Sequence, residues 1–123
     1  MRRSSPAILA LGLAAAPMPA LAESALDGRS IYRIVAGKSA SFVRSDGRAG
    51  TVTYLNGGKL VSQVQVLGRP FNVEGTWRVR GNLFCRTVRL DSPQTRCQRV
   101  VRLQGRTYRF INEDGSSTTT TFR

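Results

Sequence analysis

The chain has 123 residues, with 19 lysines and arginines against 7 aspartates and glutamates, and it contains no histidine. The lack of histidine excludes Ser-His-Asp and Cys-His nucleophile schemes, the usual general base at neutral pH, and histidine-based zinc and copper sites. The net charge of +12 favours anionic partners, or it only keeps the protein soluble.

The first 22 residues have the three parts of a secretory signal peptide. Arg2 and Arg3 are cationic, Ala7–Ala16 is an apolar run, and Ala20–Ala22 is a small-x-small cleavage site. The apolar run is too short to span a bilayer, which takes roughly 20 residues. We therefore predict cleavage near Ala22 and a periplasmic or secreted protein whose mature chain has no transmembrane segment.

The mature chain, residues 23–123, is long enough for a single domain. Without Arg2 and Arg3 it keeps 17 basic and 7 acidic residues, a net charge of +10. Only two of the basic residues, Lys38 and Lys59, are lysines. Arginine binds phosphate and carboxylate groups through paired hydrogen bonds, so the composition suits an anionic lipid, glycan or protein surface as partner.

Turn residues recur at intervals of roughly ten along the mature chain, which is typical of an antiparallel barrel or sandwich. Between the turns fit eight or nine short strands. Helical periodicity is absent outside the signal, so we expect at most one helical turn near Ala25–Arg29, and Gly28–Arg33 is interpreted as opening a strand. The threonine-rich segment Ser116–Thr121 predicts a closing strand rather than a disordered tail.

The segment Phe71–Arg80 alternates apolar and polar residues and predicts a half-buried strand. Phe71, Val73, Trp77 and Val79 form its apolar face. Trp77 on this face predicts a core residue, with the lining of a ligand cavity as the alternative. Gly75 interrupts the face and predicts a sharp bend or a bulge.

Gly81-Asn82 predicts a two-residue hairpin turn of type II′, which pairs Val79 with Phe84 and Arg78 with Cys85. The next hairpin, around Asp91–Pro93, then brings Cys97 opposite Cys85. In an exported chain these two cysteines are expected to form a disulfide, and closing a loop of this size contributes about 3 kcal/mol of stability.

The direction in which the disulfide faces stays open. An outward-facing disulfide puts Val101 and Leu103, which look like core residues, on the outer face as well. A bulge near Val100-Val101 or an inward-facing disulfide would resolve this conflict.

The second half of the mature chain is rich in arginine. Arg78, Arg80, Arg89 and Arg99 are predicted on one outer face near the disulfide, as a candidate anion-binding surface or as an ordinary solvated face. Nucleic acid is not expected as partner, because few aromatic residues are interleaved with the charges and the chain is exported.

The segment Gly75–Cys85, with Cys97, Tyr108–Phe110 and the Asp46-Gly47 and Asp114-Gly115 turns, resembles a family of short secreted bacterial proteins of unknown function with a G-T-W-x-V core and two cysteines. The resemblance covers roughly residues 42–115. It implies a lipocalin-like β-barrel and export, and it carries over no catalytic residue.

The predicted fold is an all-β antiparallel meander of about eight strands that forms a small closed or nearly closed barrel. The predicted function is non-enzymatic binding of an anionic partner, or interaction with it at the cell envelope, without cofactor or metal. The alternative is a protein inhibitor of an envelope or secreted hydrolase.

Overall fold

The computed structural model describes residues 24–89 and 93–123. The predicted signal peptide and most of the predicted turn at Asp91–Pro93 lie outside the described residues. Within them the chain forms one helix, α2, and eight strands. Their bounds are α2 Gly28–Val35, β1 Ser39–Arg44, β2 Ala49–Tyr54, β3 Lys59–Val66, β4 Arg69–Arg80, β5 Leu83–Val88, β6 Gln94–Gln104, β7 Thr107–Ile111 and β8 Ser117–Phe122.

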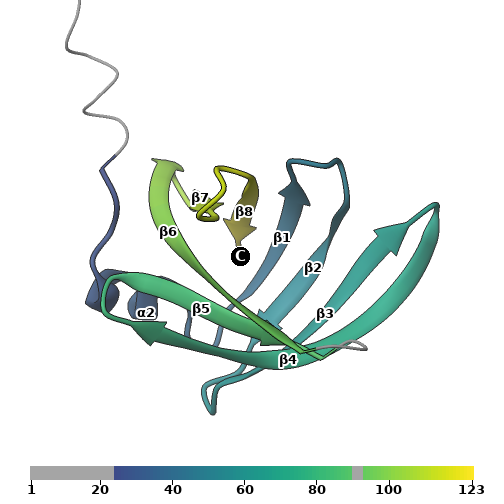
Figure 1. Cartoon of the computed structure of the whole chain (residues 1–123), viewed down its shortest axis with the longest axis horizontal. Coiled ribbons are helices and arrows are strands. Elements are labelled where there is room, and N and C mark those ends of the chain that lie inside the picture. Colours follow the sequence, from purple (N-terminus) through teal and green to yellow (C-terminus); the bar gives the residue numbers. More distant parts are fainter. Residues whose placement is uncertain (1–23, 90–92) are drawn as a thin grey trace, which may run out of the picture.

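Each strand pairs antiparallel with the next one, and β8 pairs back with β1 (Figure 1). The sheet therefore closes into an eight-stranded barrel without a free edge. This confirms the predicted all-β meander, and β8 confirms the predicted closing strand. No helix in the described part of the chain is long and apolar enough to cross a bilayer.

Helix α2 covers one end of the barrel, beside the β4–β5 turn (Figure 1). It begins after Asp27, whose carboxylate accepts a hydrogen bond from the backbone N–H three residues further on, as helix N-caps do. Ile31 and Val35 lie one helical turn apart and are fully buried in the core. The prediction of a strand opening at Gly28 was therefore wrong. Ile31, Ile34 and Val35 have the i, i+3, i+4 spacing of a helix, but the segment has only eight residues, and so short an apolar pattern does not separate a helix from a strand.

Strand β4 begins two residues earlier than predicted and crosses the whole barrel. Trp77 is buried, and its Nε1 donates a hydrogen bond to the Leu55 carbonyl at 2.9 Å, which confirms a core position. Phe71, predicted on the same buried face, is 51% exposed. Gly75 makes no bulge, because the pairing continues through it. A Cβ there would lie 2.2 Å from the Thr87 carbonyl oxygen, so the close approach of β4 and β5 requires glycine.

The disulfide joins β5 and β6 on the outside of the barrel. Arg78 lies opposite Cys85, and Cys85 lies opposite Cys97, as predicted. Successive side chains of a strand point to opposite faces of the sheet, so Arg78 and the two cysteines lie on the face opposite to Trp77. The open question of its direction is thereby settled: the disulfide faces outward.

Val101 is fully buried although it lies on this outer face. Ala25, just before α2, forms an antiparallel bridge with it, so the chain leading into the helix lies along β6 at this point. A bulge does interrupt β6, but between Arg102 and Gln104, beyond the predicted place. Leu103 is 39% exposed. Val101 is thus buried as expected, but under the segment before α2 rather than inside the barrel, whereas the interpretation of Leu103 as a core residue was wrong.

Candidate functional site

Aromatic side chains fill the interior of the barrel near α2. Five of them pack edge to face, tilted or stacked, with Phe84 at their centre and ring centroids 5.2 to 6.2 Å from its own for Phe110, Tyr54 and Trp77. The fifth is Phe122, which contacts both Tyr54 and Phe110. This cluster fills the barrel near the helix. The opposite end, where the β1–β2, β3–β4 and β7–β8 connections lie, has no described helix over it, and we call it the open end.

Three arginines lie on the inner face toward the open end. Arg86 on β5 lies between Trp77 on β4 and Arg96 on β6, directly opposite both in the register. It therefore lies on the same face as the core tryptophan. Arg44 ends β1 and lies opposite Thr118 on β8, in line with the buried side chains of that strand. We call Arg44, Arg86 and Arg96 the mouth arginines.

The charges of two mouth arginines are partly balanced by turn carboxylates. Arg44 forms an ion pair with Asp46, with 2.9 Å between its Nη2 and Asp46 Oδ2. Asp114 has a lowered pKa, chiefly because it accepts hydrogen bonds from the Ser116 hydroxyl and backbone N–H, and to a smaller extent because Arg96 is near. These two arginines thus have negative groups close by.

Arg86 differs from the other two. Burial lowers the pKa of its guanidinium; the nearby Tyr54 acts in the opposite direction, while Arg44 and Arg96 lower the pKa further by repulsion. Within residues 24–89 and 93–123, no carboxylate lies within ion-pair distance of it. Like charges directly opposite each other on antiparallel strands repel. Arg86 is therefore a partly buried cation without a carboxylate partner among the described residues.

The inner face also carries neutral polar groups, beside apolar side chains of β3, β4 and β5. Gln98 and Thr120 are the two buried polar residues of the described chain. Asn112 donates a hydrogen bond from its Nδ2 to the Ser116 hydroxyl at 2.9 Å, and its Oδ1 is buried without a hydrogen-bond partner among the described atoms. Burial raises the pKa of Tyr54 to about 12, so its phenol stays neutral at ordinary pH. The mouth thus combines cationic groups with neutral hydrogen-bonding groups.

The four arginines predicted as an anion-binding surface lie elsewhere. Arg78 and Arg99 are exposed on the outer face beside the disulfide, and Arg80 is exposed near the β4–β5 turn. Arg89 follows β5 at the open end, where its backbone N–H donates to the Glu74 carbonyl at 3.0 Å. The structure brings Arg78, Arg80 and Arg99 together around the disulfide but not Arg89. Their binding role stays a prediction.

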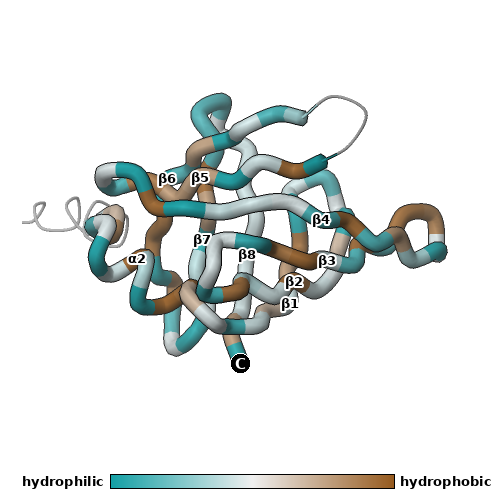
Figure 2. Tube along the Cα trace, turned by 90° about the horizontal axis from the view of Figure 1, so that it is seen from below, coloured by the Kyte–Doolittle hydropathy of each residue, from teal (hydrophilic) through white to brown (hydrophobic). Residues whose placement is uncertain are grey.

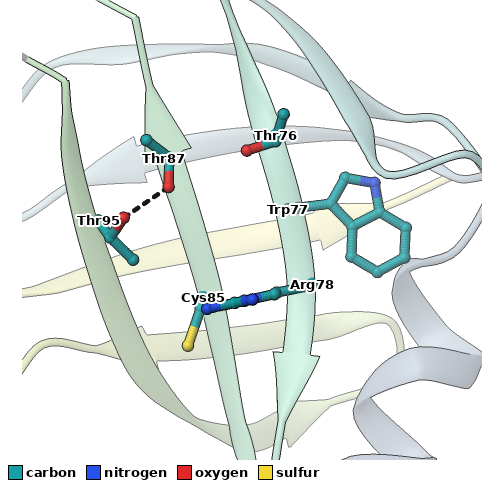
Figure 3. A pocket seen from close by; sticks show the side chains of 6 residues that line it. All are labelled: Thr76, Trp77, Arg78, Cys85, Thr87 and Thr95. Atoms are coloured by element: carbon teal, nitrogen blue, oxygen red, sulfur yellow. Dashed lines mark hydrogen bonds between the residues drawn. The ribbon is translucent and has the colours of Figure 1, made fainter.

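A shallow hollow lies on this outer face, beside Arg78 and Cys85 (Figure 3). Threonines line most of the rest of it, and Thr87 and Thr95 hydrogen-bond each other through their hydroxyl oxygens at 2.7 Å. Figure 3 shows the indole of Trp77 on the other side of the sheet, so this side chain does not project into the hollow. Thr87 and Thr95 are thus paired with each other and Arg78 is exposed to water, and no buried side-chain atom of this hollow lacks a hydrogen-bond partner.

The described thiols and aspartates are all engaged by other groups of the fold. Both thiols are in the disulfide. Asp27, Asp46 and Asp114 have lowered pKa values, because backbone or hydroxyl groups of their own turns or caps donate hydrogen bonds to them. A carboxylate with a lowered pKa is a weak base. The described residues contain no group of three or more cysteines, aspartates and glutamates arranged to hold a metal ion.

Arg86 and Arg96 were not among the four arginines predicted as a site. The signal was nonetheless present: the register that pairs Val79 with Phe84 also places Arg86, two residues further on, on the core face. An arginine between Phe84 and Val88 is readily interpreted as lying on the other face because of its charge. The end of the barrel at which it lies follows only from the position of α2.

Comparisons with known proteins add little. No family model and no curated protein matches the chain, so the family resemblance stays a prediction. Among solved structures, the crystal structure of rhizavidin is similar, with a TM-score of 0.49 and 13% sequence identity over 78% of this chain and 92% of that one. We base no argument on a likeness at this level.

Proposed function

We propose that this protein is a small, exported, non-enzymatic binding protein that holds an anionic group in the open end of its barrel. The observation that carries the proposal is the position of Arg86, on the core face and directly opposite Arg96. Two arginines opposite each other on neighbouring strands, one of them partly buried, are stabilised by an anion that binds both. A phosphate or carboxylate group has the geometry that arginines bind.

The structure favours the mouth arginines over the outer arginines as the site. A solvated arginine such as Arg78 has water as its partner and needs no other. Arg86 is partly buried, so less water competes with an anion for its guanidinium. Neutral donors near it, such as the Tyr54 hydroxyl, suit a ligand that also accepts hydrogen bonds.

Export is supported by two features. The first 22 residues have the pattern of a signal peptide. The Cys85–Cys97 disulfide is of a kind that persists in oxidising compartments. Together they favour a periplasmic or secreted binding protein. The absence of a free thiol among the described residues and the lowered pKa values of the turn aspartates support a role without catalysis.

The test is a titration of the chain from residue 23 with inorganic phosphate at constant ionic strength, followed by backbone NMR shifts. We expect saturable shifts at Arg86, Arg96 and their strand neighbours. The Arg86→Met variant is expected to lose these shifts, whereas Arg78→Met, a matched change on the outer face, keeps them.

Two further arms complete the test. Sodium acetate in place of phosphate shows whether a carboxylate is preferred. Asp91→Asn, which removes a carboxylate outside the described residues, is expected to leave binding in place. Shifts centred on Arg78 and Arg99, or equal binding by the Arg86 and Arg78 variants, would show that the site is the outer face and that the proposal is wrong.

A further inference from the structure

The β3–β4 hairpin carries a conformationally unfavourable residue at its tip. Leu67 and Gly68 connect the two strands, with φ angles of +52° and +77°. Two positive φ angles define a type I′ turn, whose first position is normally asparagine, aspartate or glycine. Leu67 is the only residue other than glycine with a positive φ among the described residues. A leucine here destabilises the turn relative to asparagine.

This leucine has no packing role in the barrel. Its side chain is 97% exposed, the most of any large apolar residue in the described chain. Phe71, four residues further on, is 51% exposed. Figure 2 shows the tip of the β3–β4 hairpin as an apolar projection that extends away from the rest of the barrel. An apolar, strained and fully exposed tip indicates contact with something outside this fold.

Positive charge lies at the same end of the barrel as this projection. Arg69 begins β4 directly after the tip. Arg44 and Arg48 lie in the β1–β2 hairpin and Arg89 follows β5; both segments end on the same side of the barrel, opposite to α2. Asp46 balances Arg44, but Arg48, Arg69 and Arg89 form no ion pair within the described residues.

We infer that the tip of the β3–β4 hairpin inserts into the surface of an anionic lipid bilayer, with Leu67 among the lipid chains and the arginines of the open end at the headgroups. A bilayer presents an apolar layer beneath negative charge, and the open end of the barrel presents an apolar tip together with positive charge. A single small projection suits insertion better than it suits a protein interface, which buries roughly 800 Å² on each partner. The inference does not depend on the anion site at Arg86.

The experiment measures cosedimentation of the chain from residue 23 with vesicles of phosphatidylglycerol and phosphatidylcholine, and with vesicles of phosphatidylcholine alone. We expect binding to the anionic vesicles that weakens as salt is raised, and much weaker binding to the neutral ones. Leu67→Asn is expected to weaken binding about tenfold, the effect of removing most of one buried leucine.

The variants separate loss of contact from loss of fold. Asparagine suits a type I′ turn, so Leu67→Asn is expected to keep or raise the melting temperature. Leu55→Asn is the matched control, because Leu55 is 41% exposed in the turn between β2 and β3, at the end of the barrel near α2. It is expected to bind vesicles as the unchanged protein does.

Three outcomes would overturn the inference: no binding to anionic vesicles at low salt, equal binding to neutral vesicles, or equal binding by Leu67→Asn and the unchanged protein. Inhibition of a protease specific for leucine that is lost in Leu67→Asn, without vesicle binding, would assign the tip to a protein partner instead. The phosphate titration of Leu67→Asn is expected to match that of the unchanged protein, so failure of one proposal is distinguished from failure of the other.

Discussion

Replacing Arg86 by methionine is expected to stabilise the protein in the absence of anions. Methionine keeps most of the aliphatic volume of arginine and removes the guanidinium, which is partly desolvated and repelled by Arg44 and Arg96. Replacing buried charges by apolar residues of similar volume is neutral to stabilising, by up to several kcal/mol. Because Arg86 keeps some contact with water at the open end, we expect a gain of about 1–2 kcal/mol.

The same variant is expected to lose its advantage when an anion is added. A ligand at one hundred times its Kd stabilises the protein that binds it by about 2.7 kcal/mol. Phosphate at this excess is therefore expected to make the unchanged protein more stable than Arg86→Met, reversing the order seen in its absence. The measurement is urea unfolding followed by Trp77 fluorescence, in chloride and in phosphate buffers of equal ionic strength.

One result would refute the expected reversal in the order of stability. If Arg86→Met is less stable than the unchanged protein in chloride, the guanidinium already has a partner within the protein and the argument from an uncompensated charge fails. Arg78→Met, on the exposed outer face, is the control and is expected to change stability by no more than about 0.5 kcal/mol in either buffer.

Two further predictions concern the barrel itself. Gly75→Ala is expected to destabilise the protein by about 1–3 kcal/mol in urea unfolding, because its Cβ would lie 2.2 Å from the Thr87 carbonyl oxygen. The control is Gly57→Ala, whose Cβ would have open space around it. Equal effects of the two substitutions would show that β4 and β5 can move apart. The pKa of Tyr54 is raised from 10.0 to about 12 by burial, so stability is complete below pH 10 and is expected to fall by about 2–3 kcal/mol as the pH rises from 10 to 12. Tyr54→Phe is expected to lack this part of the decline in stability. A decline between pH 10 and 12 that is as large in Tyr54→Phe as in the unchanged protein would contradict the prediction.

Local patterns were enough to predict the register of the disulfide hairpins. Gly81 adopts a φ of +60°, as the first central position of a type II′ turn requires, and the pairings of Arg78 with Cys85 and Cys85 with Cys97 follow from it. A hairpin register depends on the turn between its own strands, so a short stretch of sequence contains the information. Predictions of this kind were confirmed.

The candidate site depended on information of another kind. Arg86 and Arg96 come into register through one hairpin, but Arg44 joins them only because β8 pairs with β1 and closes the barrel. The helix α2 escaped prediction because it has only eight residues, too few for the spacing of Ile31, Ile34 and Val35 to separate a helix from a strand. Arginine is rarely found on a core face without a partner, so its charge argues against an inward position.

By itself, the sequence determined the signal-like leader, the all-β class, the meander order and the outer disulfide, because each depends on composition or on residues close together along the chain. Only the tertiary structure decided which end of the barrel is closed, which arginines face inward, and that Leu67 projects beyond the rest of the fold. These properties depend on ring closure and on the packing of α2 against strands remote in sequence. The disulfide thus stabilises the outer wall, whereas the groups suited to binding lie at the open end.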